Sequence, residues 1–93
     1  MVLTSLLALM VQTAAPAAQR DPLTQRMHQY CRSKPRCVAR QQQSVRAFLD
    51  MITRQRLPQP VIQRCLAKAA KGRLTDWSAA ESCLKRAISQ RRQ

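Results

Sequence analysis

Four cysteines, Cys31, Cys37, Cys65 and Cys83, constrain the fold of this 93-residue chain more than any other feature. Their number is even, and a domain of this size buries a small share of its surface and commonly needs covalent help to be stable. We therefore expect two disulfides, provided that the chain reaches an oxidising compartment. The sequence alone leaves three pairings of the four cysteines open.

The first 18 residues, MVLTSLLALMVQTAAPAA, indicate such a compartment because they contain no charged side chain. The apolar stretch over residues 2–11 is typical of a secretory signal and is shorter than the roughly 20 residues that span a bilayer. Ala15-Pro16-Ala17 offers the Ala-x-Ala pattern of a cleavage site. We predict a signal peptide over residues 1–18, cleaved after Ala17 or Ala18, and one helical domain over residues 19–93 with a short basic C-terminal tail.

Two helices are expected in the first half of the domain. Asp21-Pro22 is a typical helix start, with a carboxylate as the cap and proline in the first turn. Pro35 is expected to end this first helix. The second runs from about Arg36 to Arg56, and its apolar residues recur on one face at helical spacing.

Two more helices are expected after Leu57-Pro58-Gln59-Pro60, which separates them from the second. We expect Gly72, the only glycine, to end the third helix in a left-handed conformation. The fourth begins near Thr75 or Ser78, where Ser78 and Glu81 fit a capping box. No segment shows the alternation of a strand, so the expected fold is all-α, a small array of three to four short helices.

The helix breaks favour one pairing of the cysteines. Cys31 and Cys37 flank the Ser33-Lys34-Pro35 break, and Cys65 and Cys83 flank the Gly72-Arg73-Leu74 break at similar distances on each side. We therefore predict disulfides between Cys31 and Cys37 and between Cys65 and Cys83. A thiol metal site is the alternative, but the cysteines have five, 27 and 17 residues between them, unlike the short spacings of zinc modules. We predict no metal and no cofactor.

Charge gives the main indication of function. The chain has 17 Lys and Arg against four Asp and Glu, a net charge of +13. Such a charge attracts anionic partners over long range. The candidate anion-binding residues share the face of the second helix opposite its apolar stripe, and they are Arg36, Arg40, Arg46 and Arg54.

Catalysis finds little support in the sequence. One glycine leaves no phosphate-cradling loop, and three aromatic residues are too few for a base-stacking surface. His28 is the only imidazole. Three of the four carboxylates lie at expected helix starts, which leaves Asp50 without a second acid. We expect no catalytic residues.

The expected function is therefore that of a small exported protein, periplasmic or extracellular, with a binding or accessory role. An acidic protein or an envelope polymer is the favoured partner. A lipid headgroup stays open, and a nucleic acid is disfavoured because no reading motif is present. Two alternatives remain: a membrane-attached small subunit of a larger complex that keeps its N-terminal segment, and a cationic membrane-active peptide or toxin.

Overall fold

A computed structural model describes residues 21–92, and four helices and a short hairpin occupy this range. The elements are α2 (Pro22–Cys31), α3 (Pro35–Gln55), α4 (Gln59–Ala69), β1 (Ala70–Lys71), β2 (Leu74–Thr75) and α5 (Trp77–Arg91). The predicted helical class with two disulfides is confirmed. The predicted signal peptide and its cleavage site lie outside the described residues.

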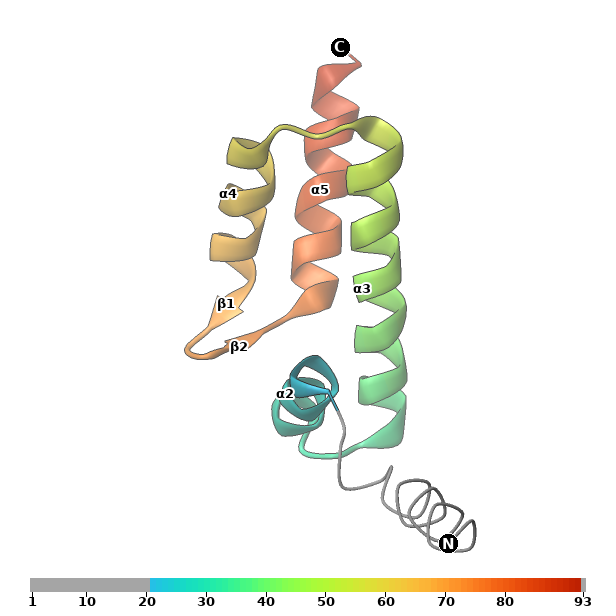
Figure 1. Cartoon of the computed structure of the whole chain (residues 1–93), viewed down its shortest axis with the longest axis vertical. Coiled ribbons are helices and arrows are strands. Elements are labelled where there is room, and N and C mark those ends of the chain that lie inside the picture. Colours follow the sequence, from blue (N-terminus) through green and yellow to red (C-terminus); the bar gives the residue numbers. More distant parts are fainter. Residues whose placement is uncertain (1–20, 93) are drawn as a thin grey trace, which may run out of the picture.

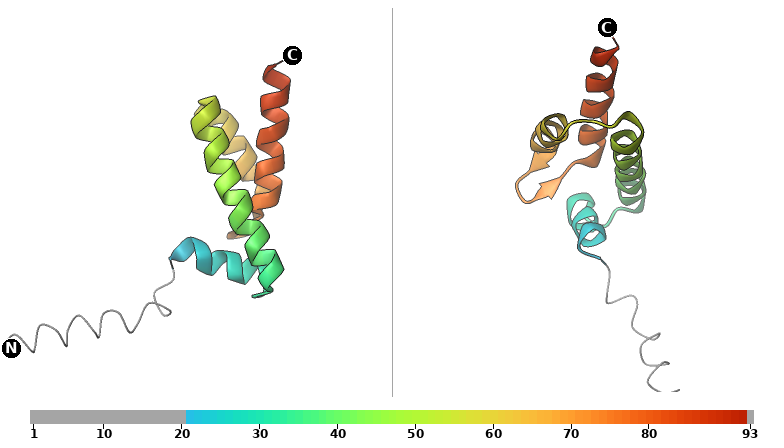
Figure 2. Two further views of the ribbon diagram at one scale, coloured as in Figure 1. Left: turned by 90° about the vertical axis from the view of Figure 1, so that its right-hand side faces the viewer. Right: turned by 45° about the horizontal axis from the view of Figure 1, so that its top comes forward.

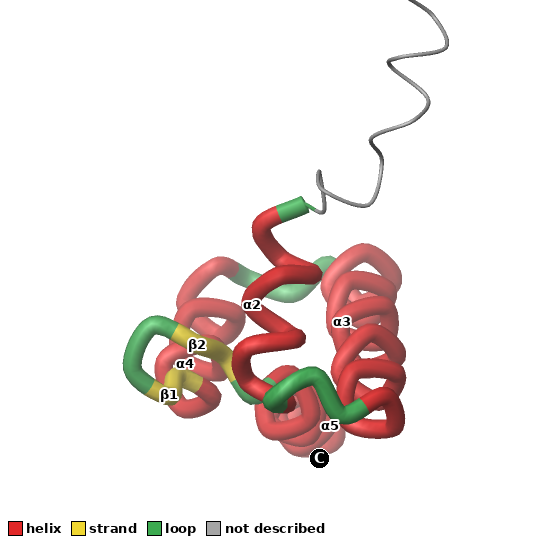
Figure 3. The backbone as a smooth tube through the Cα atoms, turned by 90° about the horizontal axis from the view of Figure 1, so that it is seen from below, coloured by secondary structure: helices red, strands yellow, loops and turns green. Residues whose placement is uncertain are grey.

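Three helices form the body of the domain, with α3 and α4 both packed on α5 (Figure 1). The fourth helix, α2, crosses one end of this body and contacts α3 and β2 (Figures 2 and 3). Within residues 21–92, no helix is long and apolar enough to cross a membrane.

The hydrophobic core lies between α3, α4 and α5. Phe48 of α3 and Leu84 of α5 are 3% and 0% exposed, and the ring of Trp77 meets Phe48 edge to face at 5.4 Å between centroids. Burial of each large apolar side chain contributes about 1.5–3 kcal/mol. The remaining buried members of the core are Leu57, Ile62, Cys65, Ala69, Ala80 and Cys83.

Both predicted disulfides are present. Cys31–Cys37 joins the end of α2 to the start of α3, and Cys65–Cys83 joins α4 to α5. Their sequence separations are 6 and 18 residues. By the loop-closure relation, restricting the unfolded chain in this way contributes about 2 and about 3 kcal/mol respectively.

The prediction that Gly72 ends a helix is wrong. The α4 helix ends at Ala69, and Ala70 is already extended. Gly72, at φ +63°, belongs instead to the two-residue turn between β1 and β2, where Ala70 pairs with Thr75. These two-residue strands were not expected, because a strand this short carries no readable alternation.

Arginine occupies the left-handed position at the ends of α2 and α3, where glycine is usual. Arg32 closes α2 at φ 52°, and Arg56 closes α3 at φ 48°. The following amides then reach back, Ser33 N donating to His28 O at 2.8 Å and Leu57 N to Ile52 O at 3.3 Å. Left-handed backbone is unfavourable for side chains with a Cβ, so the sequence gives no obvious signal for either helix end.

The expected boundaries of the later helices are confirmed in part. Pro35 begins α3 rather than ending α2. Asp76, one of the carboxylates expected at a helix start, caps α5, and the helix begins at Trp77, between the predicted starts at Thr75 and Ser78. Glu81 therefore completes no capping box, and its carboxylate pairs with Lys85 Nζ at 3.1 Å.

Candidate anion-binding site

All four acidic side chains of the described chain are already engaged. Asp21 and Asp76 cap helices, and Asp50 and Glu81 pair with the basic residue four positions later on the same helix. Among residues 21–92, therefore, Arg54 and Lys85 are the basic residues that have an ion-pair partner. The basic side chains of the chain far outnumber its carboxylates, so the protein offsets its own positive field only in part.

The four arginines predicted to bind anions do not form one site. All four are exposed, but Arg36 and Arg54 are 18 residues apart on α3, which is about 27 Å along the helix. Arg54 Nε contacts Asp50 at 2.9 Å. The structure brings Arg36 and Arg40 together, and it leaves Arg46 and Arg54 elsewhere on the helix.

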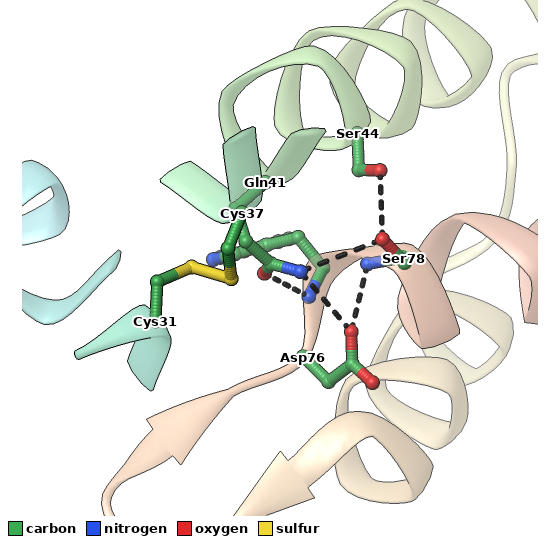
Figure 4. The surroundings of a disulfide bond; sticks show 7 residues. Cys31, Cys37, Gln41, Ser44, Asp76 and Ser78 are labelled. Carbon is green, nitrogen blue, oxygen red and sulfur yellow. Dashed lines mark hydrogen bonds between the residues drawn. A yellow bond between two sulfur atoms is a disulfide. The ribbon is translucent and has the colours of Figure 1, made fainter. Parts of the chain in front are cut away.

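Arg36 and Arg40 line a depression of about 420 Å³ where α2, α3 and α5 meet, here called the junction groove. Its other lining residues are Tyr30, Cys37, Gln41, Asp76 and Ser78. Figure 4 shows the Cys31–Cys37 disulfide beside the polar side chains of this groove. The groove thus contains a carboxylate as well as two guanidinium groups.

The buried amide of Gln41 organises the junction groove (Figure 4). Its Oε1 accepts a hydrogen bond from Trp77 N at 2.7 Å, and its Nε2 donates to Asp76 Oδ1 at 3.3 Å. Asp76 Oδ1 also accepts from Ser78 N at 3.1 Å and from Ala79 N at 3.3 Å. These bonds satisfy the free N–H groups in the first turn of α5.

Asp76 stays ionised in this setting. Partial burial raises its pKa, but hydrogen bonds from Gln41, Ala79 N, Tyr30 and Ser78 N outweigh burial, and the net pKa lies below its ordinary value. Burial and the hydrogen bond to Asp76 raise the pKa of Tyr30. The carboxylate therefore offsets part of the positive field of Arg36 and Arg40 and disfavours an anion here.

A second depression, about 250 Å³ in volume, lies between α4 and α5 and is here called the α4–α5 groove. Arg64 and Lys68 of α4 and Arg86 and Gln90 of α5 line it, and no carboxylate does. Ala87 and the Cys65–Cys83 disulfide complete the lining. This groove is the more strongly cationic of the two.

Sequence reasoning missed the residues of the α4–α5 groove, although a signal was present. Arg64 directly precedes Cys65, Lys68 follows Cys65 by three residues, and Arg86 follows Cys83 by three. Residues three apart share a helix face, so a bridge between Cys65 and Cys83 brings these cations to one side of a helix pair.

The cysteines and the histidine, which can ligate metals, do not meet in one cluster in the described range. All four cysteines are in disulfides, which leaves no thiolate to ligate a metal. His28 is half-buried on α2. Within residues 21–92, no three His, Cys, Asp or Glu side chains come together as metal ligands would.

No protein-family model, curated protein or solved structure matches the chain.

Proposed function

We propose that this protein is exported to the periplasm or the extracellular space and there binds an anionic partner, an acidic protein or an anionic envelope polymer, without catalysing a reaction. The two disulfides support export, because such bonds persist in oxidising compartments and are rare in the cytosol. The uncharged leader in the sequence agrees with that route.

The observation that carries the proposed binding role is the engagement of every carboxylate between residues 21 and 92. Two carboxylates cap helices and two pair within a helix, against a net charge of +13 for the chain. These four carboxylates offset the positive field only in part, and none of them is left over to pair with the remaining basic residues. The excess positive charge steers anionic partners towards the surface and speeds encounter, an effect that salt screens.

Binding to a soluble or polymeric anion is favoured over disruption of a membrane. A membrane-active amphipathic helix must present a continuous apolar face to lipid. Here the apolar faces of α3, α4 and α5 form one core, and Cys65–Cys83 holds two of these helices together. The large apolar side chains left exposed in the described chain are Leu23 and Leu49, on different helices.

Titration of the oxidised protein with poly-glutamate and with inorganic polyphosphate tests the proposed function. We expect binding at low ionic strength that weakens steeply towards about 0.15 M salt, and none to polyglutamine. Failure to bind either polyanion at low ionic strength would contradict the proposal. Leakage of anionic vesicles at the same protein concentration would instead support the membrane-active alternative.

A further inference from the structure

We propose that the α4–α5 groove binds an acidic segment of another protein, whose Asp or Glu carboxylates pair with Arg64, Lys68 and Arg86. This inference rests on the proposed function. It adds where on the molecule the anionic partner binds and which chemical groups of the partner are bound.

The electrostatics of the groove favour an anion here over the other concave surfaces described. Arg64, Lys68 and Arg86 have no ion-pair partner among residues 21–92. Glu81 precedes Cys83 by two residues, which places it about 200° around α5 from that cysteine, and it pairs with Lys85. By contrast, the junction groove contains Asp76, and a further depression between α3 and α5 contains Glu81.

The Cys65–Cys83 disulfide links the two helices that carry the cationic side chains of the groove. Its Cα atoms are 5.5 Å apart, and both cysteines are buried, at 1% and 7% exposure. Arg64 neighbours one bridged cysteine, and Lys68 and Arg86 each follow a bridged cysteine by three residues. The helix backbones that carry the three cations are therefore fixed before a partner arrives, which lowers the entropic cost of binding.

The donors of the groove suit carboxylates spread along a chain better than a single phosphate. Phosphate sites commonly use free backbone N–H groups at a helix start. Residues 64–68 and 86–90 lie within α4 and α5, so their N–H groups already bond to carbonyls four residues earlier. Arg64 and Lys68 are one helical turn apart, about 6 Å. Alternate side chains of an extended segment are about 6.6 Å apart, so every second residue of such a segment can meet a cation.

The shape and lining of the groove favour a peptide over a lipid surface. A flat bilayer makes poor contact with a concave site, and the small side chain of Ala87 leaves room for a chain to approach. Gln90 offers an amide that can bond to a peptide backbone. The exposed Leu23 and Leu49 lie on α2 and α3, so neither belongs to the helices of the groove.

A binding comparison between two charge-matched variants tests this assignment. The probe is a fluorescent octapeptide of alternating Glu and Ala, with a Gln and Ala peptide as its neutral counterpart. The groove variant combines Arg64→Gln, Lys68→Gln and Arg86→Gln. The control variant combines Arg36→Gln, Arg40→Gln and Arg46→Gln, which removes the same charge from exposed positions of α3. Thermal unfolding verifies that each variant is folded. If the triple groove variant does not fold, the three single substitutions replace it in the binding comparison.

We expect the groove variant to weaken binding of the acidic peptide about tenfold or more and the control variant to weaken it less than about threefold, a difference well above the effect of net charge alone. Equal weakening in both variants would overturn the groove assignment and leave the proposed function intact. Failure of the unmodified protein to bind the acidic peptide and both polyanions would remove the proposed function as well.

Two further measurements locate the contact and separate the ligand classes. In an amide NMR titration with the acidic peptide, we expect the largest shifts at residues 64–68 and 86–90. Largest shifts at Arg36 and Arg40 would overturn the assignment. Inorganic phosphate and anionic vesicles are then added as competitors of the bound peptide. If either displaces the peptide at a lower concentration of negative charge than unlabelled acidic peptide does, the ligand of the groove is a phosphate or a lipid and not an acidic segment.

Discussion

The side-chain amide of Gln41 in α3 accepts a hydrogen bond of 2.7 Å from the backbone of Trp77, 36 residues later, at the first position of α5. Gln41 is 3% exposed, so this bond joins the two helices inside the protein. The cap of α5, Asp76, accepts from the next two amides, Ser78 N and Ala79 N, so Gln41 supplies the acceptor for the first amide of the helix. A residue of the longest helix thus fixes the start of the last one.

Replacing Gln41 by alanine is expected to lower the free energy of unfolding by about 2–3 kcal/mol, because it leaves a partly buried N–H of α5 without its acceptor. Urea denaturation gives this value. The neighbouring Gln42 is exposed, so Gln42→Ala is the matched control and should change stability by less than about 0.5 kcal/mol. Equal effects of the two substitutions would show that the Gln41–Trp77 bond has no special role.

The depressed pKa of Asp76 predicts an acid-dependent stability. The contribution of its ionised form is present above its unfolded pKa, near pH 4, and is lost as pH falls through the lower pKa of the folded state. Asp76→Asn keeps an oxygen acceptor but removes the charge. It should therefore lower the free energy of unfolding by about 1 kcal/mol at pH 7 and by progressively less below pH 4.

Urea denaturation across this pH range checks the prediction for Asp76, and absorbance titration of Tyr30, the only tyrosine, gives a second readout. Because the hydrogen bond to Asp76 contributes to the raised pKa of Tyr30, Asp76→Asn should bring that pKa down. If Asp76→Asn lowers the free energy of unfolding equally at every pH and leaves the pKa of Tyr30 unchanged, ionised Asp76 does not stabilise the fold in the way described.

The two disulfides are expected to differ in their contribution to stability. Replacing Cys65 and Cys83 together by alanine should lower the free energy of unfolding by about 3 kcal/mol or more. The loop that this disulfide closes is longer than that of Cys31–Cys37, and both side chains belong to the core. The corresponding change at Cys31 and Cys37 should cost about 2 kcal/mol. Urea denaturation of the two double variants decides the order, and a larger cost at Cys31 and Cys37 would contradict it.

The left-handed Arg56 offers a site for stabilisation. Arg56→Gly relieves the steric cost of φ 48° and is expected to raise the free energy of unfolding by up to about 1 kcal/mol, after the greater backbone entropy of glycine is taken into account. Arg46→Gly removes the same charge from the interior of α3 and should cost about 1 kcal/mol. If thermal unfolding shows both glycines destabilising to the same degree, Arg56 is not under backbone strain.

The sequence predicts the elements whose signals are local. Asp21-Pro22 starts α2 as expected, and the breaks at Ser33-Lys34-Pro35 and Gly72-Arg73-Leu74 predict both disulfide pairings through the positions of the cysteines around them. The role of Gly72 as a helix end is nevertheless predicted wrongly, since left-handed geometry serves a helix end and a hairpin turn equally well. Which of the two forms depends on how α4 and α5 pack.

The candidate site depends still more on tertiary structure. Helical spacing places Arg36 and Arg40 on one face, but it does not indicate that Asp76 lies beside them. The cations of α4 and α5 meet only after Cys65 and Cys83 are joined. Net charge therefore predicts the sign of a ligand, whereas the place where it binds follows from the fold.

The intact mass of the natural product, measured without reduction, tests most directly the claim that this chain is exported and stabilised by disulfides. We predict a polypeptide that begins at Ala18 or Gln19 and is lighter by four hydrogen atoms than its reduced form. A full-length product from the cytoplasm with four free thiols would contradict that claim.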